Sequence, residues 1–222
     1  MPVPVIAIDG PAGSGKGTLA KRLAAELGYD YLDTGLLYRA VGKKIVDAGA
    51  DPSNVEVATR MALSLQPEDL AAPGLRGESM GRNASICSSI PGVRSALLDY
   101  QRDFASNPPG GRGAILDGRD IGTAVCPTAN LKIWVTASAE ARAHRRHAED
   151  PGGLGLAEIF AAIKERDDRE TSRAASPMIP ASDARLIDTT ALAAEQAFDI
   201  ALGWAKDELG ASAGTAPSRP KM

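Results

Sequence analysis

The chain is poor in cysteine and in long apolar runs, and each shortage excludes a class of protein. Only two of its 222 residues are cysteines, Cys87 and Cys126, and they form no CxxC pair. We therefore expect neither a disulfide framework nor a structural zinc site. No stretch approaches the roughly 18 apolar residues of a membrane-spanning helix, and the N-terminus lacks the basic and apolar regions of a signal peptide. These absences predict a cytoplasmic protein without a membrane partner.

The chain has no excess of positive charge, and aromatic residues are scarce. The 25 Lys and Arg residues are outnumbered by 28 Asp and Glu, giving a formal net charge of −3, and aromatic residues make up 4% of the chain. Proteins that hold long nucleic acids usually carry a basic excess or an aromatic stacking platform, so we expect no nucleic-acid partner. Seventeen of the basic residues are nevertheless Arg. This bias suits phosphate ligands but also follows from arginine-rich codon usage, so the positions of the arginines must decide.

Short strands alternate with helices along the chain, a pattern typical of an α/β protein. Apolar stretches predict five strands, over residues 3–9, 29–32, 114–116, 131–135 and 184–187. Helical periodicity predicts helices over 16–27, 35–48, 54–65, 79–106 (broken near Pro91), 137–148, 156–173 and 191–209. We expect one domain over residues 1–209, a five-stranded parallel sheet with helices on both faces. Residues 210–222 show no periodicity and predict a disordered tail.

The first predicted strand leads into a glycine-rich segment that matches GxxxxGK, formed by Gly10, Pro11, Ala12, Gly13, Ser14, Gly15, Lys16, Gly17 and Thr18. Between a strand and a helix, such a loop wraps its backbone N–H groups around nucleotide phosphates, and the lysine reaches the outer ones. We therefore predict binding of a nucleoside triphosphate here rather than an unliganded turn. Because Gly17 stands where a Ser or Thr usually binds Mg²⁺, we expect the metal to be held through the nucleotide and water near Thr18.

Arginines at the ends of predicted strands and on one helix indicate an acceptor for the phosphoryl group. Arg39 and Arg119 each follow a candidate strand, where ligands of parallel sheets bind. Arg166 and Arg173 are seven residues apart and share a helix face with Glu170. The helix group alone would also fit an exposed ladder of salt bridges.

The chain offers no well-placed catalytic base. Its two histidines, His144 and His147, lie together in an arginine-rich helix. A sugar or alcohol acceptor needs a base to remove its hydroxyl proton, whereas a phosphate acceptor is already an anionic nucleophile at neutral pH. No asparagine lies in the NKxD motif with which GTPases read guanine. The residues therefore favour transfer to a nucleotide.

Seven segments together resemble the bacterial cytidylate kinases, which are P-loop nucleoside monophosphate kinases. They are GPAGSGKGT, DTGLLYR, SIPGVRSALL, DGRDIGT, ARAHRR, IKERDDRETSR and DARLIDTT, and they extend over about residues 3–209. DGRDIGT and the arginine-rich helix segment are the most specific of them. The resemblance implies ATP-dependent phosphorylation of CMP and dCMP with Mg²⁺. It also implies a monophosphate-binding lobe at about 34–106 and a mobile lid at about 142–156.

The resemblance further assigns roles to single residues. It implies that the transferred phosphate meets Lys16 and that the acceptor phosphate is clamped by Arg39, Arg119 and Arg173. The cytosine would be read by Ser85, Arg94 and Asp120, whose donors and acceptors suit that base. The ribose side would be formed by Thr34, Arg166 and Glu170. The lid would bring Arg142, Arg145 and Arg146 over the phosphates. The catalytic candidates are therefore Lys16, Arg119, Arg173, Arg142 and Arg146.

Three features depart from the pattern of this family. Glu170 replaces the usual Asp, which leaves the preference between ribose and deoxyribose open, and Thr34 replaces a common Ser but keeps the hydroxyl. The segment between Leu65 and Ser79 is too short for the small sheet that many members insert, so we expect a mostly helical lobe.

The alternative functions are those of an adenylate or UMP/CMP kinase of the other monophosphate-kinase type, a non-catalytic nucleotide-binding module and a nucleic-acid-phosphorylating enzyme. We expect a monomer.

Overall fold

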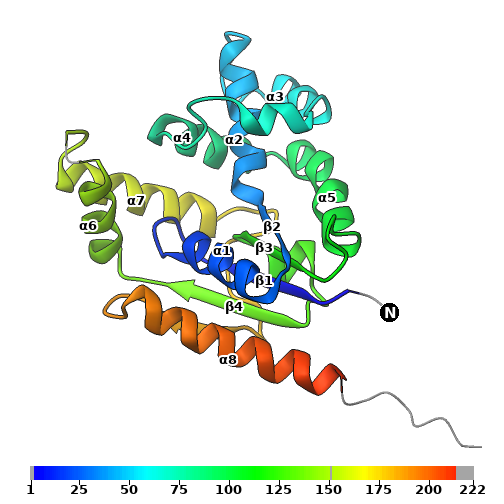
Figure 1. Ribbon diagram of the computed structural model, residues 1–222. Helices are drawn as coiled ribbons and strands as arrows, with labels where there is room; N and C mark the ends of the chain where they lie inside the picture. Colours follow the sequence, from blue (N-terminus) through cyan, green and yellow to red (C-terminus); the bar gives the residue numbers. More distant parts are fainter. Residues whose placement is uncertain (1–2, 151, 214–222) are drawn as a thin grey trace, which may run out of the picture.

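Five parallel strands form the centre of the protein, in the order β2-β3-β1-β4-β5 (Figure 1). They are β1 (Val5–Asp9), β2 (Asp30–Asp33), β3 (Ala114–Gly118), β4 (Leu131–Thr136) and β5 (Arg185–Asp188). This computed structural model describes residues 3–150 and 152–213. The predicted five-stranded parallel sheet is confirmed.

Helices cover both faces of the sheet because the strands are apolar on both sides. Ile6 and Ile8 of β1 pack toward α1 (Lys16–Leu27) and α8 (Ala194–Ala213). Ala7, which points to the opposite face, belongs to a second cluster with residues of α5 (Pro91–Ser106) and the π-helical turn η2 (Ile121–Val125). A strand buried on both faces is a short continuous apolar run, and that run followed by a glycine-rich turn is the signal that identified it.

The region predicted as the monophosphate-binding lobe is helical throughout. It contains α2 (Thr34–Asp47), α3 (Val55–Leu63), η1 (Pro67–Ala71), α4 (Glu78–Cys87) and α5. These helices enclose a core of their own, with Leu37, Ile45 and Leu97 buried. The short 3₁₀ helix η1 lies where a loop was predicted; Pro67 starts it, and the Asp69 carboxylate accepts from Gln66 N at 2.8 Å.

Two further helices, α6 (Ala139–Glu149) and α7 (Leu156–Thr171), cover the region of the predicted lid. They pack together through Ala143, Ile159 and Ile163 and lie beside α4 and the loop that follows β1 (Figure 1). At the other end of the chain, α8 continues to Ala213, so residues 210–213 are helical where a tail was predicted. The rest of the predicted tail, 214–222, lies outside the described residues. No described helix is long and apolar enough to cross a membrane.

Candidate active site

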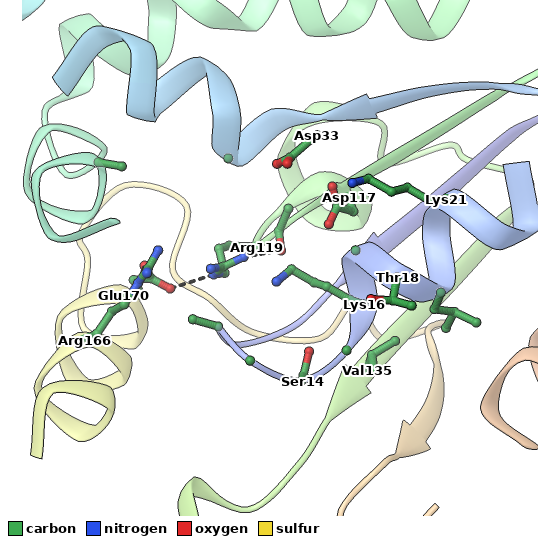
Figure 2. A pocket seen from close by; sticks show the side chains of 18 of the residues that line it. Ser14, Lys16, Thr18, Lys21, Asp33, Asp117, Arg119, Val135, Arg166 and Glu170 are labelled. Carbon is green, nitrogen blue, oxygen red and sulfur yellow. Dashed lines mark hydrogen bonds and ion pairs between the residues drawn. The ribbon is translucent and has the colours of Figure 1, made fainter. Parts of the chain in front are cut away.

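One cavity of about 660 Å³, called here the central cavity, opens at the carboxyl ends of β1, β2 and β3. Its lining includes Lys16, Asp117, Arg119, Arg166 and Glu170 (Figure 2). Several of these residues are far apart in the sequence. The ends of β1 and β3 bring the first three together, and helix α7 carries the other two. The volume falls in the range typical of small-ligand sites.

The phosphate loop forms one wall of this cavity. Gly10 follows β1 with a φ of +148°, and a Cβ built there would lie 1.9 Å from the carbonyl oxygen of Val135, so no larger residue fits. The loop then leads into α1, which begins at Lys16. The positive end of this helix dipole therefore points at the place where the motif predicts phosphates.

Lys16 reaches into the central cavity from the start of α1. Its ammonium donates to the carbonyl oxygen of Pro11 at 3.2 Å, and the side chain is buried. Burial, followed by the positive charge of Arg119, lowers the pKa of Lys16 to about 7. Figure 2 shows Lys16 and Arg119 extending into the same space.

Glu170 of α7 joins two of the predicted acceptor arginines. Its two carboxylate oxygens accept from Arg119 Nε and Arg166 Nε, each at 2.7 Å, and its side chain is only 3% exposed. Although burial alone would raise it, the two guanidinium groups hold the pKa of Glu170 well below its usual range. The helix face is therefore no exposed ladder, because its central carboxylate is buried against a loop from β3.

Arg39 and Arg173 line the same cavity from α2 and from the segment after α7. Arg39 Nη1 donates to the carbonyl oxygens of Leu75 and Gly77 at 2.8 and 2.9 Å, and burial lowers its pKa to about 10. Arg173 donates to Ser88 Oγ at 3.3 Å and to the Ser176 carbonyl oxygen at 2.8 Å. The structure thus brings the predicted clamp residues Arg39, Arg119 and Arg173 into one positively charged enclosure.

The three predicted cytosine readers also line the central cavity. Arg94 of α5 forms an ion pair with Asp120, which follows β3, and both side chains are largely buried. The Arg94 guanidinium lies 5.8 Å from the centre of the Tyr38 ring. Ser85 of α4 is 1% exposed. A buried carboxylate and a buried hydroxyl therefore share this end of the cavity.

The arginines of the predicted lid are held differently from one another. Arg142 is buried, donates to the carbonyl oxygens of Ala137 and Ala12 at 3.0 and 3.1 Å, and pairs with Asp167. Arg145 donates to Thr189, whose hydroxyl in turn donates to the carbonyl oxygen of Ser14 at 2.9 Å.

Arg146 lines the central cavity, and burial lowers its pKa. Of the three lid arginines, Arg142 is thus committed to protein acceptors. Arg145 fastens α6 to the phosphate loop through Thr189.

Thr34, predicted on the ribose side, is buried and donates from Oγ1 to the carbonyl oxygen of Asp117 at 2.8 Å. This bond braces the start of α2 against β3. Asp9 plays a similar part, since its carboxylate accepts from the N–H groups of Ile121 and Gly122 at 2.8 and 2.7 Å. It fixes the turn that carries Arg119 and Asp120.

Asp117 is the residue that sequence reasoning missed at this site. It is the last residue but one of β3, is buried, and accepts from the Tyr31 hydroxyl at 3.0 Å. Burial raises its pKa despite the nearby charge of Lys16. Its position directly after the predicted strand 114–116 was a signal, because an Asp at the end of a strand helps to hold Mg²⁺ in P-loop nucleotide hydrolases.

The surroundings of Asp117 fit the magnesium ion that the phosphate loop implies. A Cβ built on Gly17 would lie 3.4 Å from Asp117 Oδ2, so the carboxylate faces the gap left by the missing loop hydroxyl. No group of three or more potential metal ligands occurs among the described residues. Mg²⁺ typically binds one or two carboxylates together with phosphate oxygens and water, rather than a full protein cage.

A family model described as cytidylate kinase matches residues 6–207. The chain is 59% identical over 202 residues to the cytidylate kinase of Paramagnetospirillum magneticum, covering 90% of this chain and 96% of that protein.

The cytidylate kinase of Rhodospirillum rubrum is 53% identical over 202 residues, covering 89% of this chain and 95% of that protein. Among solved structures, an uncharacterized protein from Eubacterium ventriosum matches with a TM-score of 0.55 at 14% identity. That match covers 92% of this chain and 98% of the other, and supports the fold alone.

Proposed function

The chain belongs to the cytidylate kinase family, and from this premise we infer that it transfers the γ-phosphoryl group of ATP to CMP, giving ADP and CDP. The observation that carries the proposal is the central cavity. It places Lys16 of the phosphate loop and the Arg94–Asp120 pair at the same enclosure as Arg39, Arg119 and Arg173. The cavity thus has the phosphate loop at one end, the polar Arg94–Asp120 pair at the other and arginines between them. This arrangement suits two nucleotides that meet at their phosphates.

In this proposal the phosphate loop and Lys16 hold the phosphates of ATP, and the arginines hold the acceptor phosphate. An oxygen of the acceptor phosphate attacks the γ-phosphorus, and the bond to the β–γ bridging oxygen breaks. The acceptor oxygen is already anionic, so no base is required, and the described part of the cavity lining contains no histidine. Catalysis then rests on alignment and on neutralising charge that spreads over the transferred group.

Asp117, with water near Thr18, is the residue we assign to hold Mg²⁺ beside the ATP phosphates. When bound, the ion supplies positive charge to the β- and γ-phosphate oxygens. Asp117 contributes a buried carboxylate at the start of α1, and Tyr31 orients that carboxylate by its hydrogen bond. Thr18 is exposed at the first turn of the same helix, where its hydroxyl is accessible to solvent.

We propose that dCMP is accepted beside CMP. The carboxylate of Glu170 already binds Arg119 and Arg166 through both oxygens, and the Thr34 hydroxyl proton is donated to the protein backbone. Both groups are therefore already paired within the protein, so a hydrogen bond from a 2′-hydroxyl would add to these contacts rather than supply a missing one. That the enzyme acts as a monomer in the cytoplasm stays a prediction.

A panel of acceptors tests this function. With ATP and Mg²⁺, coupled detection of ADP should give kcat/KM for CMP and dCMP within about tenfold of each other, and about a hundredfold or more above UMP, AMP and GMP. The reason is the buried Arg94–Asp120 pair, which leaves unpaired polar groups against the wrong base. Equal use of AMP or UMP would contradict the cytosine assignment, and ATP binding without turnover on any acceptor would favour a binding module.

Binding of ATP is expected to take up a proton at pH 8. The pKa of Lys16 in the free protein is about 7, so the amine is mostly neutral at pH 8. Bound phosphates favour its charged form and raise that pKa. Titration calorimetry without Mg²⁺, in two buffers of different ionisation enthalpy, should report close to one proton at pH 8 and much less at pH 6.

The same titration has an internal control. Lys16→Arg keeps the charge but cannot lose its proton in this pH range, so its binding enthalpy should not depend on the buffer. Because Mg²⁺ is left out, no metal changes the protonation of the Asp117 carboxyl, whose pKa burial raises. A parent enzyme without buffer dependence at pH 8 would show that Lys16 is already charged when the site is empty.

A further inference from the structure

Arg169, which the proposed chemistry does not use, contacts one of the predicted base readers. It lies on α7 and donates from Nη1 to Ser85 Oγ on α4 at 3.2 Å. Its other terminal nitrogen pairs with Glu165, one turn earlier on α7. Helices α4 and α7 pack against each other (Figure 1). The helix that carries Arg166 and Glu170 therefore also reaches the base-binding end of the central cavity.

The chemistry of Arg169 fixes the direction of this hydrogen bond. A guanidinium has only N–H donors, so Ser85 Oγ must accept. The Ser85 hydroxyl keeps its own proton, and no hydrogen bond recorded between the described residues uses it. Ser85 is buried at 1% exposure and lines the cavity. Because a buried hydroxyl proton without an acceptor is unfavourable, the base that enters should offer an acceptor atom there.

The neighbouring groups complete the pattern. Ser88 Oγ donates to the carbonyl oxygen of Ser85 at 3.0 Å and accepts from Arg173 at 3.3 Å, so its hydroxyl is committed. Asp120 accepts from Arg94 and, as a carboxylate, can accept further hydrogen bonds. The pocket thus presents a donor at Ser85 and an acceptor at Asp120. Cytosine matches with its ring nitrogen and amine, whereas uracil carries an N–H and a carbonyl oxygen in those positions.

We propose that Arg169 is a positioning residue that orients the Ser85 hydroxyl as a donor and so favours CMP over UMP. This inference rests on the proposed function and deepens it. Without Arg169, the Ser85 hydroxyl would rotate freely and could accept as readily as donate. Discrimination between the two pyrimidines would then weaken, while the arginines around the acceptor phosphate would keep their partners.

The test compares the ratio of kcat/KM for CMP and UMP in a small set of variants. Arg169→Met removes the donor but keeps the apolar stem, and it should lower the ratio about tenfold, mainly through KM for CMP. Arg169→Lys keeps a donor and should retain most of the ratio. Lys164→Met is the matched control, because it also removes a positive charge from α7 but at an exposed side chain that does not line the cavity, and it should leave the ratio unchanged.

Coupling to Ser85 separates positioning from a general structural role. In a Ser85→Ala background, Arg169→Met should change the ratio by less than about twofold, since the hydroxyl it orients is gone. An equal fall in both backgrounds, or a fall in kcat with an unchanged ratio, would overturn the proposal. If circular dichroism shows Arg169→Met unfolded, Arg169→Leu, which also lacks a donor, is read by the same criteria.

The two proposals fail in different ways. A parent enzyme that uses UMP as well as CMP overturns the proposed function and this inference with it. A parent that prefers CMP, beside an Arg169→Met variant that keeps the full preference, overturns this inference alone.

Discussion

Arg119→Ala is expected to lower kcat for CMP phosphorylation by about a thousandfold, the scale on which a transition-state arginine acts in phosphoryl transfer. Arg119 lies between the two halves of the reaction. Its charge helps to lower the pKa of Lys16 on the donor side, and its Nε binds Glu170 on the acceptor side. The side chain is largely buried, so its charge acts where water screens little.

The measurement is steady-state kcat and KM with saturating ATP. Arg119→Lys should recover only part of the loss, because an ammonium keeps the charge but not the planar fork. Arg82→Ala is a suitable control, since Arg82 lies exposed on α4 and does not line the cavity. An Arg119→Ala enzyme with more than about a tenth of the parent kcat would show that Arg39 and Arg173 carry the acceptor phosphate without it.

The fold was predictable as far as it depends on local pattern. Apolar runs located all five strands within a few residues, and Gly28 ended the first helix as expected. The strand order was not predictable, because a strand buried on both faces carries no mark of its neighbours. Helix α8 continues past its predicted end at Leu209, because Gly210 is followed by Ala211 and Ala213, which favour the helix.

The candidate site, like the fold, was predictable only where the signal is local in the sequence. The phosphate loop and the arginines at strand ends were recognisable because motif and strand end coincide in the sequence. Tyr31–Asp117 and Ser85–Arg169 were not, since each pair is separated by more than 80 positions. Their chemistry arises only when strands β2 and β3 pair in register and α4 packs on α7.

The contacts of Arg142 differ from those predicted. The resemblance implied that Arg142, like Arg146, lies over the phosphates as part of the lid. The structure buries it instead, where it holds the Ala12 carbonyl oxygen of the phosphate loop and pairs with Asp167. Whether an arginine of this helix points inward or along the cavity depends on the crossing of α6 and α7, which periodicity does not specify. A catalytic part for Arg142 therefore stays a proposal that needs these partners to change.

Glu170→Gln is expected to lower both stability and activity. The two arginines that Glu170 joins are largely buried, and a neutral amide can accept from only one Nε while its own NH₂ faces the other. Removing one charge from a buried cluster leaves the others uncompensated, which lowers the free energy of unfolding by about 3 kcal/mol. We also expect kcat to fall about a hundredfold, because Arg119 loses the bond that aligns it.

The lowered pKa of Glu170 predicts how the difference in stability between parent and variant depends on pH. The pKa of Glu170 is held below its unfolded value, so its contribution is fully present above about pH 5 and is lost as pH falls toward the folded pKa. Urea unfolding followed by circular dichroism should therefore separate parent and variant most at neutral pH and bring them together in acid. Glu165→Gln, on the same helix but exposed, should change stability by less than about 0.5 kcal/mol.

Ligand should distinguish a lost charge from lost packing in the Glu170→Gln variant. The phosphate of CMP brings negative charge to the arginines that Glu170 otherwise neutralises, so saturating CMP should recover part of the lost stability. A variant that is destabilised but gains no more from CMP than the parent would point to packing. A variant as stable as the parent would show that Arg119 and Arg166 keep their positions without the Glu170 carboxylate. In that case kcat should also equal that of the parent.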